Sequence, residues 1–273
     1  MKEGYYVVRT YEAGTVGEKI KFFVPGDRPT GKLRRKERDA ARKAEDNKHA
    51  AEKELARILN ANFNGDDLLL GLDYAEQGMD KILKWGRKQG LAVDAEDERV
   101  RADAIWECAA HELDNCIRRV KRILAKEGRE LKAVYATSDM DGETEEMVRV
   151  HHHLVISKED KQAFLTAWQE KGLGGVDWAP MWDCQQDRTP IAKYIIRQVR
   201  RIPDAKKYRT TRNLVRPRPK DRIALSGAEL RVPANATLLF RAMYDRPGAA
   251  QYIRYILPRK EKKGKGRVES DSC

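Results

Sequence analysis

The stretch Asp67–Tyr74 places an apolar side chain at every second residue, and this pattern limits the possible folds more than any other segment. Side chains two residues apart lie on one face of a β-strand, so the stretch predicts a strand whose buried side is made by Leu68, Leu70, Leu72 and Tyr74. Leu131–Thr137 and Val148–Ser157 are two further apolar stretches of strand length. The loop between them is short, which favours antiparallel pairing.

Helical patterns lie between and after these strands. The residues 101–126 carry an apolar stripe at the helical period, namely Ile105, Ala109, Leu113, Cys116, Val120 and Leu124. Shorter helices are predicted over Lys161–Lys171 and from Thr189, the expected N-cap before Pro190, to about Arg201. We therefore expect an α+β fold, with a central antiparallel sheet and helices on one face.

The two ends of the chain add further elements. Tyr5–Thr10 and Lys19–Val24 predict a hairpin, Leu33–Asn60 predicts a long charged helix, and Gln251–Leu257 predicts a closing strand. We expect four segments: an N-terminal extension at 1–60, the main domain at 61–222, a C-terminal extension packed on it at 223–258, and a basic disordered tail at 259–273.

Positive charge is concentrated in one part of the chain. The net charge is +12, and the residues 199–222 contain ten Lys or Arg but only two acidic residues. Such a cluster suits a phosphate backbone, because binding there releases counterions. The alternative is a solvated basic face. The predicted DNA-binding residues of this segment are Arg200, Arg201, Lys206, Lys207, Arg209, Arg212 and Asn213.

Three consecutive histidines interrupt the predicted strand Val148–Ser157. His151 and His153 point to the same face, about 7 Å apart along the strand, whereas His152 points to the other face. Two imidazoles on one face can reach a single divalent metal ion. The alternative is a surface histidine cluster, which the flanking apolar residues disfavour. His151 and His153 are therefore predicted metal ligands.

A nucleophile is predicted on the helix that begins near Thr189. Tyr194 lies at the border of its apolar stripe, and Arg197 follows one turn later. A phenol is a weak nucleophile at its usual pKa and needs a neighbouring cation or base to favour the phenolate. By itself, Tyr194 would be assigned to the core. The preceding histidine pair changes this assignment.

Four motifs in this order resemble the HUH endonucleases, and in particular the replication-associated proteins of bacterial plasmids and small phages. Phe63–Tyr74 resembles the first strand motif of that superfamily, and Arg149–Ile156 resembles its metal motif. Tyr194–Arg197 resembles the nucleophile motif, and Thr211–Pro217 resembles a segment that follows it. The resemblance implies a ferredoxin-like palm.

The resemblance also implies roles for individual residues. His151 and His153 would hold Mg²⁺ or Mn²⁺, and Tyr194 would attack a phosphate of single-stranded DNA with Arg197 beside it. The products are a 5′-phosphotyrosine and a free 3′-OH that primes synthesis. Some relatives carry a second tyrosine where this chain has Gln198, so Gln198 is expected to matter little. The third metal ligand is expected in the region of Ser138 and Asp139.

The leading prediction is therefore a metal-dependent tyrosine DNA endonuclease that initiates rolling-circle replication at an origin. A host helicase and polymerase would be its further partners. The alternatives are a transposase or relaxase of the same superfamily, a catalytically inactive DNA-binding regulator of replication, and an RNA-binding module, which the aromatic content of 7% disfavours. The chain has no apolar run long enough to span a bilayer and no closely spaced cysteine pair, so we expect a cytoplasmic protein without membrane contacts.

Overall fold

The computed structural model describes residues 4–24, 26, 40–144, 146–181, 186–199, 206–224, 229–244 and 250–258. The chain divides into two compact units, which we name by their place in the sequence. The central unit contains Glu12–Gly14 and Arg28–Arg218. The terminal unit contains Met1–Tyr11, Thr15–Asp27 and Pro219–Cys273.

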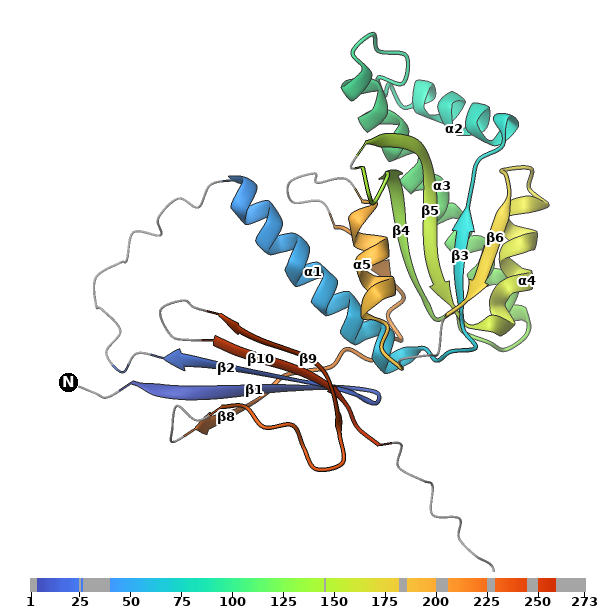
Figure 1. The fold of residues 1–273 in the computed structure, drawn as a ribbon. Helices are drawn as coiled ribbons and strands as arrows, with labels where there is room; N and C mark the ends of the chain where they lie inside the picture. Colours follow the sequence, from blue (N-terminus) through green and yellow to red (C-terminus); the bar gives the residue numbers. More distant parts are fainter. Residues whose placement is uncertain are drawn as a thin grey trace, which may run out of the picture. The chain divides into compact units, whose positions relative to one another are not determined.

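The central unit is built on a five-stranded antiparallel sheet with the order β6-β3-β5-β4-β7 (Figure 1). The strand β5, which carries the three histidines, is the middle strand of this sheet. The strands are β3 (Leu68–Leu72), β4 (Ala133–Met140), β5 (Met147–Ile156), β6 (Val176–Pro180) and β7 (Arg209–Thr210).

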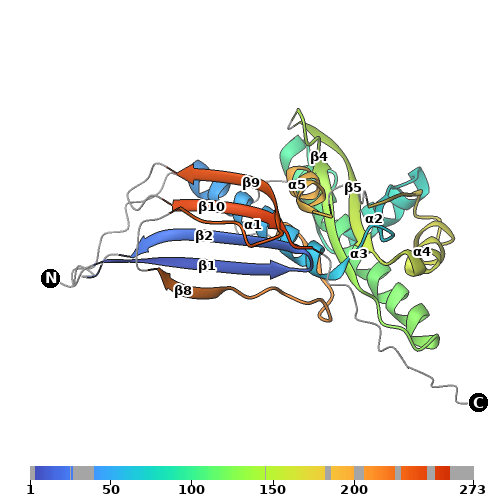
Figure 2. The ribbon, with the colours of Figure 1, turned by 60° about the horizontal axis from the view of Figure 1, so that its bottom comes forward.

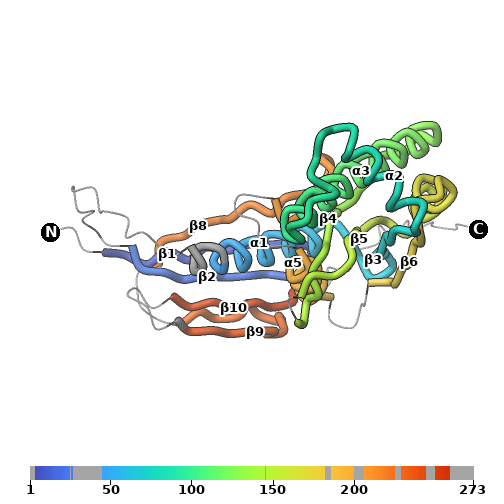
Figure 3. The backbone as a smooth tube through the Cα atoms, turned by 90° about the horizontal axis from the view of Figure 1, so that it is seen from above, coloured from blue at the N-terminus to red at the C-terminus, as the bar shows by residue number. Residues whose placement is uncertain are grey.

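Helices cover both faces of this sheet. The helices of the unit are α1 (Ala40–Asn62), α2 (Glu76–Lys88), α3 (Glu98–Lys126), α4 (Lys161–Phe164) and α5 (Thr189–Arg197). A 3-10 turn (Lys158–Asp160) precedes α4, and a π-helical turn (Leu165–Gln169) continues it. Figure 3 shows α2 and α3 on one side of β4, β5, β3 and β6, with α5 beside β4.

The expectation of helices on one face was wrong, because both faces of the strands are apolar. Leu70 and Leu154 belong to the core shared with α2 and α3. Val134 and Val155 belong to a second core, which contains Leu59 of α1 and Ile195 of α5. Burying one such side chain stabilises the fold by about 1.5–3 kcal/mol. Several of them on each face therefore hold the two layers of helices against the sheet.

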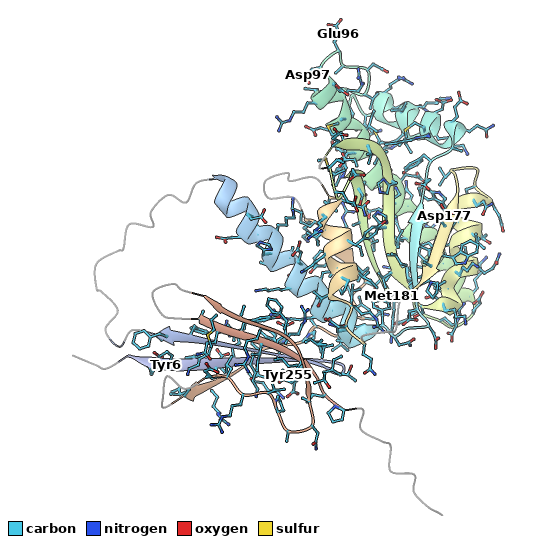
Figure 4. The ribbon with its side chains drawn as sticks, viewed as in Figure 1. Tyr6, Glu96, Asp97, Asp177, Met181 and Tyr255 are labelled. Atoms are coloured by element: carbon cyan, nitrogen blue, oxygen red, sulfur yellow. The ribbon has the colours of Figure 1, made fainter. Side chains whose placement is uncertain are left out.

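Local signals explain where the longest helix begins. Asp97 is the N-cap of α3, and its carboxylate accepts hydrogen bonds from the backbone N–H groups of Arg99 and Val100 at 2.9 and 3.0 Å (Figure 4). At the other end of the unit, the backbone N–H of Met181 donates to the carbonyl of Asp67 at 2.8 Å, which ties the end of β6 to the start of β3.

The terminal unit is a second five-stranded sheet, with the order β8-β1-β2-β10-β9 (Figure 2). Its strands are β1 (Tyr5–Ala13), β2 (Val16–Val24), β8 (Lys220–Ala224), β9 (Thr237–Tyr244) and β10 (Ala250–Ile256). The strands β1 and β2 form the expected hairpin, and Gly14 in its turn has a positive φ of 61°. Strands from the expected segments 1–60 and 223–258 thus share one sheet.

The α+β class is confirmed, but the second sheet was not anticipated. The charged helix is described from Ala40 onward, and its expected start at 33–39 lies outside the described residues, as does the basic tail at 259–273. Within the described part of the chain, no helix is both long and apolar enough to cross a bilayer.

Candidate metal centre and nucleophile

The strand β5 directs its three histidines to opposite faces of the sheet. His152 is buried on the α3 face, where its ring nitrogens lie 2.9 Å from the hydroxyl of Tyr74 and 3.2 Å from the hydroxyl of Thr137. His151 and His153 point to the other face, which α5 covers. The alternation predicted from the sequence is therefore present, and the middle histidine is a structural residue.

The helix α5 brings a tyrosine and a glutamine to this face. Its start is fixed by Asp187, whose carboxylate accepts hydrogen bonds from the N–H and hydroxyl of Thr189 at 3.0 and 2.7 Å. Asn60 of α1 donates to the same carboxylate at 3.2 Å. Thr189 is the first helical residue and Arg188 is the N-cap, so the expectation that Thr189 is the N-cap was wrong by one residue.

The end of α5 is fastened to the end of β4. The backbone N–H groups of Asp139 and Met140 both donate to the carbonyl of Gln198, at 3.3 and 3.2 Å. These bonds form where the pairing register between β4 and β5 shifts after Ser138. The loop between β4 and β5 also approaches Gln198 closely, since a Cβ atom placed on Gly142 would lie 3.2 Å from Cγ of Gln198. Main-chain contacts therefore fix the position of Gln198.

Three polar atoms converge in front of β5. Nε2 of His151 lies 3.0 Å from Nε2 of His153. The amide oxygen Oε1 of Gln198 lies 3.2 Å from the first nitrogen and 2.9 Å from the second. We call His151, His153 and Gln198 the donor trio.

Hydrogen bonding indicates which ring nitrogens of the trio carry a proton. Nδ1 of His151 lies 2.9 Å from the carbonyl of Arg149, so it carries the proton and leaves Nε2 with a free lone pair. Burial lowers the pKa of His153 to about 4, although a hydrogen bond to Gln198 opposes this shift. His151 therefore offers a lone pair at Nε2, whereas Nε2 of His153 donates to Oε1 of Gln198 and must transfer its proton to Nδ1 before it can bind a metal ion.

The spacing of the trio fits a divalent metal ion. Two ligands at about 2.1 Å from Mg²⁺ in neighbouring octahedral positions are about 3.0 Å apart, and the three separations of the trio lie between 2.9 and 3.2 Å. No group of three His, Cys, Asp or Glu side chains suited to a metal was found among the described residues. The third donor here is an amide oxygen, a ligand type that Mg²⁺ and Mn²⁺ accept.

Gln198 was not expected near the histidines. The third ligand was expected near Ser138 and Asp139, both of which are buried beside the trio at the register shift. Gln198 follows Tyr194 by four residues, and side chains four apart lie on the same helix face. This spacing could have indicated that Gln198 lies on the same side of the helix as Tyr194.

Tyr194 is the aromatic residue beside the trio. Its ring centroid lies 5.0 Å from that of His153 in an edge-to-face arrangement, and 47% of the residue is exposed. Arg197, also exposed, lies on the same helix. The structure therefore brings together Tyr194, His153 and Gln198, and it leaves the tyrosine accessible to a ligand.

Tyr208, the second choice for a nucleophile, has a different environment. It packs against the core that α1 and α5 share with the sheet. Burial raises its pKa above the usual value, and Glu54 raises it further. A phenolate is therefore disfavoured at Tyr208.

The predicted DNA-binding residues of the segment 199–222 lie in different environments. The guanidinium of Arg209 forms an ion pair with Asp114 of α3, and Asn213 donates to the carbonyl of Leu131 at 3.2 Å. These two predicted DNA contacts also make bonds within the central unit. Lys206 and Arg212 are exposed, and Lys207 is partly buried. Arg200 and Arg201 lie outside the described residues.

Comparisons with known proteins add no assignment: no family model, no curated protein and no solved structure matches the chain.

Proposed function

We propose that the protein cuts and rejoins single-stranded DNA through a covalent intermediate on Tyr194, and that this reaction starts rolling-circle replication at an origin. The observation that carries the proposal is the position of an exposed tyrosine ring 5.0 Å from His153, within a trio of converging metal donors. A tyrosine that serves only in packing would not need to be exposed beside these three side chains.

The reaction follows from the chemistry of the phenol. Tyr194 gives up its proton, and its oxygen forms a bond to the phosphorus of the scissile phosphate. The bond from phosphorus to the 3′ oxygen breaks, and that oxygen takes up a proton to become a free 3′-OH. Attack by a 3′-OH on the phosphotyrosine reverses these steps and rejoins the strand.

The side chains around Tyr194 divide the remaining tasks. Arg197 contacts the phosphate through its positive charge. His151, His153 and Gln198 hold Mg²⁺ or Mn²⁺. When bound, the metal ion supplies a charge that withdraws electron density from the scissile phosphate. The imidazole pair favours Mn²⁺ over Mg²⁺, which prefers oxygen ligands.

The single-stranded DNA is bound by cations that form no ion pair with the described residues. Among the predicted contacts, the exposed Lys206 and Arg212 are best suited to phosphates. Arg209 is less suited, because its charge is already paired with Asp114. Single-stranded rather than double-stranded DNA is the proposed substrate, in keeping with the resemblance to the HUH endonucleases.

The test is the capture of the covalent intermediate. The full chain is incubated with Mn²⁺ and a pool of single-stranded DNA that has a random central region, and the adduct is isolated on a denaturing gel. We expect a DNA–protein adduct that requires metal, and peptide mapping should place it on Tyr194. DNA binding without any adduct would instead support the catalytically inactive replication regulator.

A further inference from the structure

Ser138 is the residue of β4 that faces the donor trio. It pairs directly with His151 in the β4–β5 ladder, and Ala136 pairs with His153. Paired residues of an antiparallel ladder point to the same face, with Cβ atoms about 4.5–5.5 Å apart. The hydroxyl of Ser138 is therefore on the face of His151 and His153.

This hydroxyl is buried without a hydrogen-bond partner. The exposed fraction of Ser138 is 0%, and its Oγ has no partner within the described part of the chain. Leaving a polar group buried and unpaired lowers stability, so each such group in a folded protein needs an explanation. The neighbouring Thr137 shows the contrast, because its hydroxyl lies 3.2 Å from Nδ1 of His152.

The backbone holds Ser138 where it is. The register shift follows immediately, and the N–H groups of Asp139 and Met140 bind the carbonyl of Gln198. Ser138 is thus enclosed between two of the trio residues, His151 across the ladder and Gln198 beyond the shift. A ligand held by the trio would lie on the same face of the sheet as this hydroxyl.

We propose that the hydroxyl of Ser138 binds a water molecule that completes the coordination of a divalent metal held by His151, His153 and Gln198; this inference rests on the proposed function for the existence of that metal. Mg²⁺ and Mn²⁺ take about six ligands, and Mg²⁺ keeps several waters. Three protein donors leave positions for water. A serine hydroxyl can both donate and accept, so it can orient such a water.

The proposal predicts opposite effects on stability and on metal binding. Ser138→Ala removes a hydroxyl that has no partner in the metal-free protein, so the melting temperature without metal should stay the same or rise. The affinity for Mn²⁺ should fall roughly tenfold to a hundredfold, the usual loss when a group beyond the direct ligands is removed. A purely structural role would lower the melting temperature and leave the affinity unchanged.

The experiment uses the full chain and Mn²⁺ alone, without DNA. Calorimetry gives the Mn²⁺ affinity, thermal melting with EDTA gives the metal-free stability, and water proton relaxation gives the number of waters on bound Mn²⁺. The matched control is Thr166→Ala, which removes an exposed hydroxyl bonded to Glu170 at 3.0 Å. This control should leave the Mn²⁺ affinity unchanged.

The outcomes separate this inference from the proposed function. Weaker Mn²⁺ binding by Ser138→Ala with an unchanged number of bound waters supports it. An additional water on the metal in Ser138→Ala would mean that Ser138 is a direct ligand. An unchanged Mn²⁺ affinity would mean that Ser138 has no role in metal binding. Either result overturns the inference and leaves the proposed function intact. A wild-type chain that does not bind Mn²⁺ would overturn both.

Discussion

The amide oxygen of Gln198 lies 2.9 Å from Nε2 of His153, although 45 residues separate them in the chain. The contact exists because the carbonyl of Gln198 is bound by Asp139 and Met140 at the end of β4, the strand next to His153. A helix end and a strand end are thus joined by main-chain hydrogen bonds. This junction places the amide oxygen of Gln198 beside the ring nitrogens of the two histidines.

Gln198 should be essential for metal binding. Gln198→Ala removes one donor, and we expect the Mn²⁺ affinity to fall at least about tenfold. Gln198→Glu keeps an oxygen donor and adds a negative charge, so its affinity should equal or exceed that of the wild type. Calorimetry with Mn²⁺ checks both variants. Equal affinity in the wild type and Gln198→Ala would exclude Gln198 as a ligand.

Tyr194 should be required for cleavage but not for folding. Tyr194→Phe removes only the hydroxyl of an exposed side chain, so the melting temperature and DNA affinity should be retained. Formation of the covalent adduct should fall by at least about a thousandfold, as expected when a nucleophile is lost. Tyr208→Phe is the matched control and should keep its adduct. Formation of an adduct by Tyr194→Phe would show that another residue is the nucleophile.

Gly142 should control the position of Gln198. In Gly142→Ala the new Cβ would lie 3.2 Å from Cγ of Gln198, and the glutamine side chain must shift. A shift of a few tenths of an ångström at a metal ligand should reduce adduct formation on the order of tenfold. Gly175→Ala, whose Cβ would meet no atom within 4 Å, is the control. Equal rates in the two variants would contradict this role.

Arg212 and Arg209 should differ in their effect on DNA binding. Arg212 is exposed, so Arg212→Gln should weaken binding to single-stranded DNA and reduce the slope of log affinity against log salt by about 0.7. Arg209 already pairs with Asp114, so Arg209→Gln should change the slope little. Fluorescence anisotropy at several salt concentrations, with EDTA present to prevent cleavage, measures both. Identical slopes in the two variants would argue against a phosphate contact by Arg212.

The buried thiol of Cys116 should make the protein less stable in alkali. Burial in α3 raises its pKa to about 12, well above that of an exposed thiol. The unfolded chain therefore loses this proton first, and the free energy of unfolding should decrease as the pH rises from 9 towards 12, by on the order of a few kcal/mol. Urea unfolding at pH 8 and pH 10.5 tests this. In Cys116→Ala the decrease should be smaller, and an equal decrease would assign it to other groups.

Local patterns in the sequence predicted most of the central unit. The alternation at Leu68, Leu70 and Leu72 and the stripe through Cys116 of α3 arise because neighbours along the chain alternate with fixed periods in strands and helices. The short strands β6, β7, β8 and β9 escaped prediction. The pairing partners of β6, β7 and β8 lie far away in the sequence, whereas β9 pairs with the neighbouring β10.

What the sequence determined by itself is the set of chemical groups: a histidine pair on one face of a strand, and a tyrosine on an amphipathic helix. Which groups meet was decided by tertiary structure. Gln198 was expected to matter little and Asn213 to bind DNA; in the structure the amide oxygen of Gln198 lies within 3.2 Å of ring nitrogens of His151 and His153, and Asn213 donates to the carbonyl of Leu131. The physical reason is that these roles depend on hydrogen bonds between residues 45 to 82 positions apart, and no local periodicity encodes such pairs.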